Sequence, residues 1–322
     1  MCKKVEGTPL SIMSNSSITP DNILDIKLKI GIDEFHATAR KKRQITENER
    51  NRFRMGTAEE DYVMVTDINM EASRMGLEIC VDTFESARNA ILGGATRLEL
   101  CSALSEGGLT PSVGFVARVR KLYTVYNYIQ FYVMLRVRSG NFIYSREEMD
   151  IMLYDLKTIK DLKLADGFVF GALTKDREID TLYCTEIILA AKPLPVTFHR
   201  AFDEIRQDPL ETIQLLMSLG IRRILSSGRE DTAEKGVNVL KMMHEHVKYP
   251  MSIMAGCGIT PDNISYIKLK TGINEFHASA RKKRQLTENE RNRFRMGTAE
   301  EDSVMVTDVN TVRKMHKIIF PS

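Results

Sequence analysis

The chain has 322 residues, of which 43% are hydrophobic, and its formal net charge is +3 at pH 7. This length permits one large domain or two smaller ones, and the small charge gives no reason to expect a nucleic-acid partner. The chain has no run of 18 apolar residues, which argues against a membrane span. Its five cysteines include no Cys-x-x-Cys motif and argue against a disulfide framework.

The chain start lacks the apolar stretch of a signal peptide. We therefore expect a globular cytoplasmic protein with neither a membrane nor a nucleic-acid partner. Two identical basic runs, residues 40–43 and 281–284, leave a nuclear location open as well. Because acidic residues follow both runs, we interpret them as solvated loops.

A long internal repeat organises the chain. Residues 11–69 recur as residues 252–310, and 47 of the 59 aligned positions are identical. The offset of 241 positions is close to the length of a (β/α)8 barrel, roughly 250 residues. It is far from the period of a solenoid, about 20–50 residues. We predict that residues 1–75 are a partial duplicate of the C-terminal segment, not integrated in the fold, and that residues 76–322 form the barrel domain.

The two copies differ at one turn. Gly256 and Gly258 of the later copy are replaced by Asn15 and Ser17 in the earlier one. Glycine reaches positive φ and lets a ligand approach the backbone more readily than these residues do. The earlier copy is therefore predicted to lack a working turn.

From residue 76 onward, short apolar runs alternate with helical patterns, which indicates βαβ units. The expected strands are 77–81, 97–101, 130–136, 167–170, 195–198, 223–226, 251–255 and 275–277. The expected helices are 85–92, 112–123, 146–162, 181–191, 209–219, 232–246, 261–269 and 311–319. Eight alternating pairs predict a closed (β/α)8 TIM barrel. The polar stretch 282–303 fits no element, and we expect a lid, an oligomer contact or a disordered loop there.

Polar side chains should point into the barrel, because strand residues alternate and the helices cover the apolar face. Buried charges are costly unless they are paired or serve a ligand. One interpretation is an internal salt-bridge network that joins two glutamates to Arg97 and Arg136. The other is a catalytic site at the C-terminal ends of the strands. Its candidate catalytic residues are Glu78, Glu99, Arg136, His199 and Asp203.

The turns after the last strands form the usual phosphate cradle of this fold. Here they predict a small-molecule or phosphate site, helped by a helix start at Thr260. Its candidate residues are Ser227, Gly228, Gly256, Gly258, Ser279 and Arg281.

Two cysteines are candidate soft metal ligands. Cys80 and Cys101 lie on the first two expected strands and should point inward at a similar height. Two thiolates suit Cu(I), or zinc with further ligands. The alternative is a pair of small buried hydrophobic residues.

Six segments resemble, in order, the motifs of the CutC copper homeostasis family: 77–82, 97–102, 104–112, 166–174, 193–203 and 275–281. The resemblance implies a TIM barrel linked to copper handling, a Cu(I)-binding homo-oligomer, and copper ligands at Cys80 and Cys101. The chain departs from the family at Cys257, where a glycine is usual.

Two functions follow from these observations. The first is Cu(I) binding for copper homeostasis in the cytosol. The alternative is an enzyme that acts on a small, phosphorylated or unphosphorylated substrate at the mouth of the barrel. The sequence leaves open whether the protein is an enzyme.

Overall fold

The computed structural model describes residues 40–44, 62–66, 75–124, 129–247, 249–291 and 302–321. The chain divides into two compact units, residues 1–73 and 74–322. In the first unit, β1 (Arg40–Gln44) pairs antiparallel with β2 (Tyr62–Thr66). The predicted difference at the turn of residues 13–19 lies outside the described residues. That residues 1–75 stand apart from the barrel stays a prediction, which is tested below.

The second unit contains eight parallel strands that close in the order β10-β3-β4-β5-β6-β7-β8-β9. They are β3 (Gly76–Val81), β4 (Arg97–Leu100), β5 (Gln130–Met134), β6 (Gly167–Phe170), β7 (Val196–Phe198), β8 (Arg223–Ser226), β9 (Ser252–Ala255) and β10 (Glu275–Ala278). Each lies within a residue or two of its expected span. The predicted TIM barrel is confirmed.

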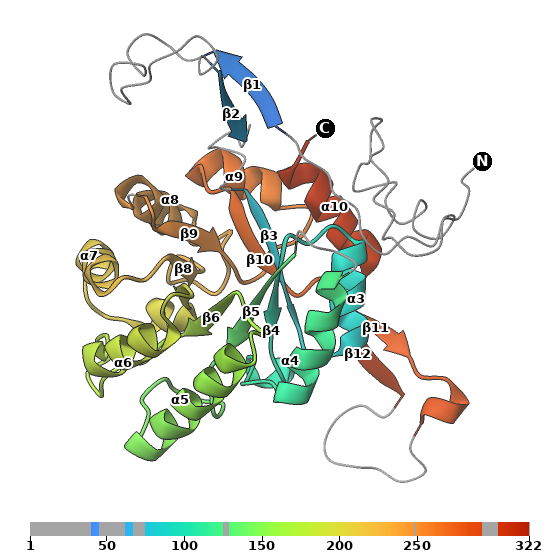
Figure 1. The fold of residues 1–322 in the computed structure, drawn as a ribbon, viewed down its shortest axis with the longest axis horizontal. Coiled ribbons are helices and arrows are strands. Elements are labelled where there is room, and N and C mark those ends of the chain that lie inside the picture. The colour runs from blue at the N-terminus through green and yellow to red at the C-terminus, as the bar shows by residue number, and fades with distance from the viewer. Residues whose placement is uncertain are drawn as a thin grey trace, which may run out of the picture. The chain divides into compact units, whose positions relative to one another are not determined.

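Eight helices follow the strands and lie on their outer side (Figure 1). They are α3 (Phe84–Leu92), α4 (Val113–Arg120), α5 (Arg146–Asp161), α6 (Thr181–Ala191), α7 (Pro209–Leu219), α8 (Val237–His246), α9 (Ile264–Thr271) and α10 (Val309–Ile319). The expected start of α7 is confirmed, because Asp208 caps it and Pro209 occupies its first position. Apolar side chains fill the layer between strands and helices, as the alternation of the strands requires.

Two helix starts were predicted wrongly, since α8 begins at Val237 rather than at residue 232 and α9 begins at Ile264 rather than at residue 261. The chain after Thr260 forms a turn, and α9 begins only at Ile264. The amide side chain of Asn263 causes the delay: its oxygen accepts from the Thr260 N–H at 2.9 Å, and its nitrogen donates to the Gly258 carbonyl at 2.8 Å. Such side-chain bonds compete with the backbone bonds of a helix.

The polar stretch after β10 is not a loop throughout, which corrects the prediction for residues 282–303. β11 (Arg281–Gln285) pairs antiparallel with β12 (Ser303–Thr307) and forms a two-stranded ribbon. The ribbon is fastened to α3, since the Thr307 N–H donates to the Ser86 hydroxyl and Asn89 donates to the Thr307 carbonyl. Its register repeats that of β1 and β2 shifted by 241 positions. Both basic runs, 40–43 and 281–284, therefore lie on strands rather than on the predicted loops.

Charged residues occupy the barrel interior, as the strand alternation predicted. Arg97 pairs with Glu78 and, at 2.8 Å, with Glu275, while Arg223 reaches the same Glu275 oxygen at 2.7 Å. The expected internal salt-bridge network therefore exists around Arg97. Glu99 is bound elsewhere, and Arg136 has no carboxylate within 4 Å in the described part of the chain. Among the described residues, no helix is both long and apolar enough to cross a membrane.

Candidate metal site at the mouth of the barrel

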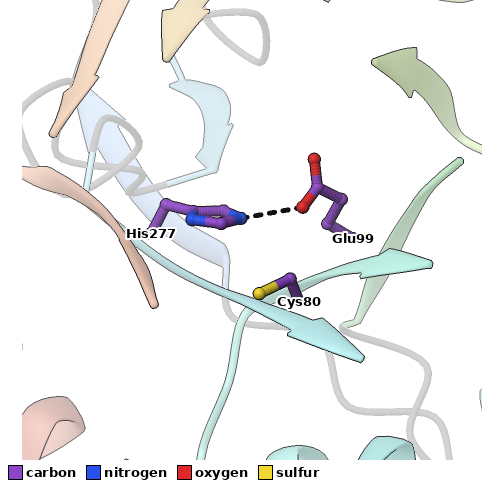
Figure 2. A group of neighbouring side chains, drawn as sticks. All are labelled: Cys80, Glu99 and His277. Carbon is purple, nitrogen blue, oxygen red and sulfur yellow. Dashed lines mark hydrogen bonds and ion pairs between the residues drawn. The ribbon is translucent and has the colours of Figure 1, made fainter. Parts of the chain in front are cut away.

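Three adjacent strands bring a thiol, a carboxylate and an imidazole together. Cys80 comes from β3, Glu99 from β4 and His277 from β10, and one ligand atom of each lies within 4.8 Å of the others. Figure 2 shows the His277 ring facing the Glu99 carboxylate, with the Cys80 sulfur beside the gap between them. All three are close to the C-terminal ends of their strands, where barrels of this kind carry their sites.

The strand register explains this meeting. His277 is opposite Glu78 on β3, and Cys80 is opposite Glu99 on β4. Side chains at paired positions of a parallel sheet share a face, so all four point into the barrel. His277 was absent from the residues predicted as metal ligands. The same alternation, applied to 275–277 as it was to the first strands, would have placed it inside.

The imidazole of His277 is held by acidic groups. Its Nε2 lies 2.8 Å from a carboxylate oxygen of Glu99 and 3.7 Å from Oε1 of Glu78. Burial lowers the pKa of His277, but the interactions of the ring with Glu99 and then with Cys80 outweigh burial and raise this pKa well above its ordinary value. The ring is therefore a cation next to acceptors. Oε1 of Glu78 and Oε1 of Glu99 are buried without a hydrogen-bond partner in the described structure.

The two predicted thiol ligands, Cys80 and Cys101, lie at different heights in the barrel. The Cys80 thiol is buried inside the cluster, 3.6 Å from the Ala278 carbonyl oxygen. Cys101 lies two residues beyond Glu99 and packs against Tyr132 and Met134, so the thiols are not at the same height. Burial, then the charges of Glu99 and Cys80, raise the pKa of Cys101 well above its ordinary value. Cys101 borders the three-residue cluster rather than belonging to it.

This donor set suits a metal ion. A thiolate and an imidazole are ligands for Cu(I) and for Zn(II), and a carboxylate oxygen can complete a zinc site. A carboxylate that hydrogen-bonds a metal-bound histidine also orients the ring and raises its basicity. Glu99 is placed for either task.

Asp203, one of the predicted catalytic residues, is engaged by its neighbours. Its carboxylate accepts from the hydroxyl of Ser226 at 2.6 Å, from the backbone and hydroxyl of Ser227, and from the backbone N–H of Arg229. Arg200 donates to it at 2.9 Å. These bonds tie the segment after β7 to the turn after β8, so the arrangement favours a positioning role for this carboxylate.

The predicted phosphate residues also have partners within the protein. The Gly228 N–H donates to the Ser226 hydroxyl, and Arg281 lies 3.5 Å from Asp82. The Ser279 carbonyl accepts from Thr307. A side chain at Gly256 would come within 2.4 Å of Leu225, which explains a glycine there by packing alone. Phosphate binding by this set stays a prediction.

A cavity of about 390 Å³ lies at a different part of the mouth, beyond β5, β6 and β7. Phe142, Ile143 and Leu173 form its apolar lining, and the ion pair of Arg177 with Glu204 lies at its edge. Two further candidates, Arg136 and His199, adjoin Phe142. Both are buried.

The family model of the CutC family matches residues 75–282. The chain belongs to the CutC family. The copper homeostasis protein cutC homolog of Homo sapiens is 44% identical over 246 residues, covering 75% of this chain and 88% of that protein. The homolog of Caenorhabditis elegans is 40% identical over 248 residues, covering 76% of this chain and 95% of that protein.

A solved structure supports the same assignment. The crystal structure of a CutC from Streptococcus agalactiae is 32% identical, with a TM-score of 0.60, and covers 64% of this chain and 98% of that one. The resemblance that the motifs indicated is thereby confirmed. The matched CutC region begins where the barrel begins, and it contains Cys80, Glu99 and His277.

Proposed function

We propose that this CutC barrel serves copper homeostasis by binding Cu(I) at its mouth, with Cys80 and His277 as ligands and Cys101 next to them. The observation that carries the proposal is the approach of the Cys80, Glu99 and His277 ligand atoms to within 4.8 Å. The names of the human and nematode relatives, which are copper homeostasis proteins, agree with it.

The donor atoms favour Cu(I) among the available cations. Cu(I) prefers soft thiolate ligands and also accepts imidazole, whereas magnesium and calcium need several oxygen ligands. Cys80 and His277 are two suitable donors, and the thiol of Cys101 is a third within the same part of the barrel. Burial of Cys80 keeps bulk water away from the bound ion.

Protons compete with the metal at this site. Metal binding needs a thiolate and a neutral imidazole, so it releases protons and weakens as the pH falls. The acidic surroundings of His277 raise its pKa, which strengthens this competition. Glu99 then balances the positive charge in both states: that of the imidazolium before binding and that of the metal afterwards.

Competition titrations with a Cu(I) chelator test the proposal. We expect wild type to hold one Cu(I) tightly, Cys80→Ser to lose the tight site, and Cys101→Ser to weaken it to a smaller extent, each while keeping the fold. Cys184→Ser is the matched control, because Cys184 is equally buried but lies on α6. Unchanged affinity and stoichiometry in both site variants would show that the cysteines are core residues.

A further inference from the structure

Arg136 is a buried cation without a carboxylate partner among the described residues. Only 6% of the residue is exposed, and its guanidinium donates to the backbone carbonyls of Glu106 at 3.1 Å and Gly140 at 2.7 Å. Its Nε is buried with no acceptor in the described part of the chain. Arg97, by contrast, pairs with two glutamates. Since a buried charge is costly without a counter-ion, Arg136 lacks an anion that the described residues do not supply.

His199 adds a neutral donor beside this cation. Its Nδ1 accepts from the Ala201 N–H at 3.1 Å, so the ring proton of the neutral form must be on Nε2. Burial, then the positive charge of Arg136, lowers the pKa of His199 to about 3. The ring is therefore neutral at physiological pH. Its Nε2–H is buried without an acceptor among the described residues.

Tyr144 supplies a third polar group. Its hydroxyl is buried beside the Arg136 guanidinium and has no hydrogen-bond partner of normal geometry among the described residues. Burial raises its pKa to about 12, and the charge of Arg136 opposes that rise, so the hydroxyl stays protonated close to the guanidinium. The ring of Phe142 lies between Arg136 and His199. The Arg136 guanidinium carbon is 5.0 Å from the centroid of the Phe142 ring, and that centroid is 4.7 Å from the centroid of the His199 ring.

The 390 Å³ cavity adjoins this group through Gly140 and Phe142, whereas Arg136, His199 and Tyr144 lie behind its lining. Gly140, which accepts from Arg136, and Phe142 both line it, together with Ile143 and Leu173. A mostly apolar cavity with a few polar groups close to it is the usual form of a small-molecule site.

We propose that Arg136, His199 and Tyr144 bind the carboxylate of a small organic acid whose apolar remainder occupies the cavity beside Phe142. A single buried cation with two neutral donors matches a monoanion, and a charge-assisted bond to arginine is the strong contact of such a site. The cluster of Cys80, Glu99 and His277 takes no part in this site, so the site does not depend on the proposed copper function.

Calorimetric titrations with 3-phenylpropionate and propionate test the site, with the corresponding amides and inorganic phosphate as comparison ligands. We expect the carboxylates to bind and the amides to fail. Arg136→Met should abolish binding, whereas Tyr144→Phe should weaken it roughly tenfold, as the loss of a hydrogen bond to a charged group does. Arg120→Met is the control, because that arginine lies on α4 and pairs with Asp166. It should bind like wild type.

Nuclear magnetic resonance of the His199 ring provides a second measurement in case Arg136→Met fails to fold. Addition of 3-phenylpropionate to wild type should shift the Nε2 signal of His199, and Cys80→Ser should show the same shift. Equal binding of amides and carboxylates, preference for phosphate over both carboxylates, or an unmoved His199 signal would each overturn the proposal.

Discussion

Nε2 of His277 lies 2.8 Å from Glu99, although 178 positions separate the two residues along the chain. Closure of the barrel between β10 and β3 makes this contact, since β4 lies on the other side of β3. The last and second strands thereby supply a histidine and its carboxylate to one site.

Replacement of Glu99 tests this relationship. Glu99→Gln removes the charge that orients His277, and loss of such a partner typically weakens metal affinity about 10–100-fold. We expect that decrease for Cu(I) in competition titrations, smaller than the loss in Cys80→Ser. Glu106→Gln, on the exposed loop after β4, is the control and should bind like wild type. Equal affinities in the two variants would remove Glu99 from the site.

The buried ion pairs of Glu275 with Arg97 and Arg223 should contribute strongly to the stability of the barrel. Glu275→Gln leaves Arg223 without its carboxylate, and breaking a buried pair in this way costs about 3–5 kcal/mol. Asp150→Asn removes an exposed carboxylate beside Arg146 and should cost less than about 1 kcal/mol. Chemical denaturation of both variants measures the free energies of unfolding. Similar losses would show that the interior pairing is not important for stability.

The same glutamate predicts a pH dependence. Burial raises the pKa of Glu275, but Arg223 and Arg97 outweigh it and lower this pKa from 4.5 to about 2. The unfolded chain therefore binds the proton first as the pH falls. The ionised Glu275 carboxylate therefore stabilises the fold above pH 4.5, and this contribution is lost as the pH decreases toward 2. Wild type should lose more stability than Glu275→Gln over this interval, and parallel pH curves would contradict the assignment.

Much of the barrel could be predicted from the sequence, because alternating strands and amphipathic helices are local patterns. The interior direction of Glu78, Arg97 and Glu99 followed from the same alternation. The ribbon β11–β12 was missed because basic residues such as Lys282 and Lys283 carry no apolar alternation. The partner of Glu99 was missed for a different reason: contact with His277 depends on closure of the sheet and on register, which no local pattern contains.

Cys257 stands at a backbone position that suits glycine. Its φ is 75°, in the left-handed region that costs other residues about 1–2 kcal/mol. Cys257→Gly removes this backbone cost but adds the entropic cost of ordering a more flexible glycine. The net effect should raise the free energy of unfolding by roughly 0.5–1 kcal/mol. Cys257→Ala retains Cβ and should give no gain. A gain with alanine as large as that with glycine would show that the thiol, and not the backbone, is unfavourable.

Removal of the duplicated segment tests the predicted domain organisation. The eight barrel strands are all present after Met75, and a closed barrel has no free edge to accept another strand. A protein that begins at Met75 should therefore melt within a few degrees of the full chain in scanning calorimetry. A larger decrease would mean that residues 1–74 stabilise the barrel.

Anomalous diffraction at the copper edge, from crystals of the reduced protein loaded with one equivalent of Cu(I), tests the central claim most directly. The proposed function predicts that the strongest peak lies at the mouth of the barrel, within bonding distance of Cys80 Sγ and of a ring nitrogen of His277. A strongest peak elsewhere, for example at the more accessible thiol of Cys257, or no peak beside Cys80, would contradict it.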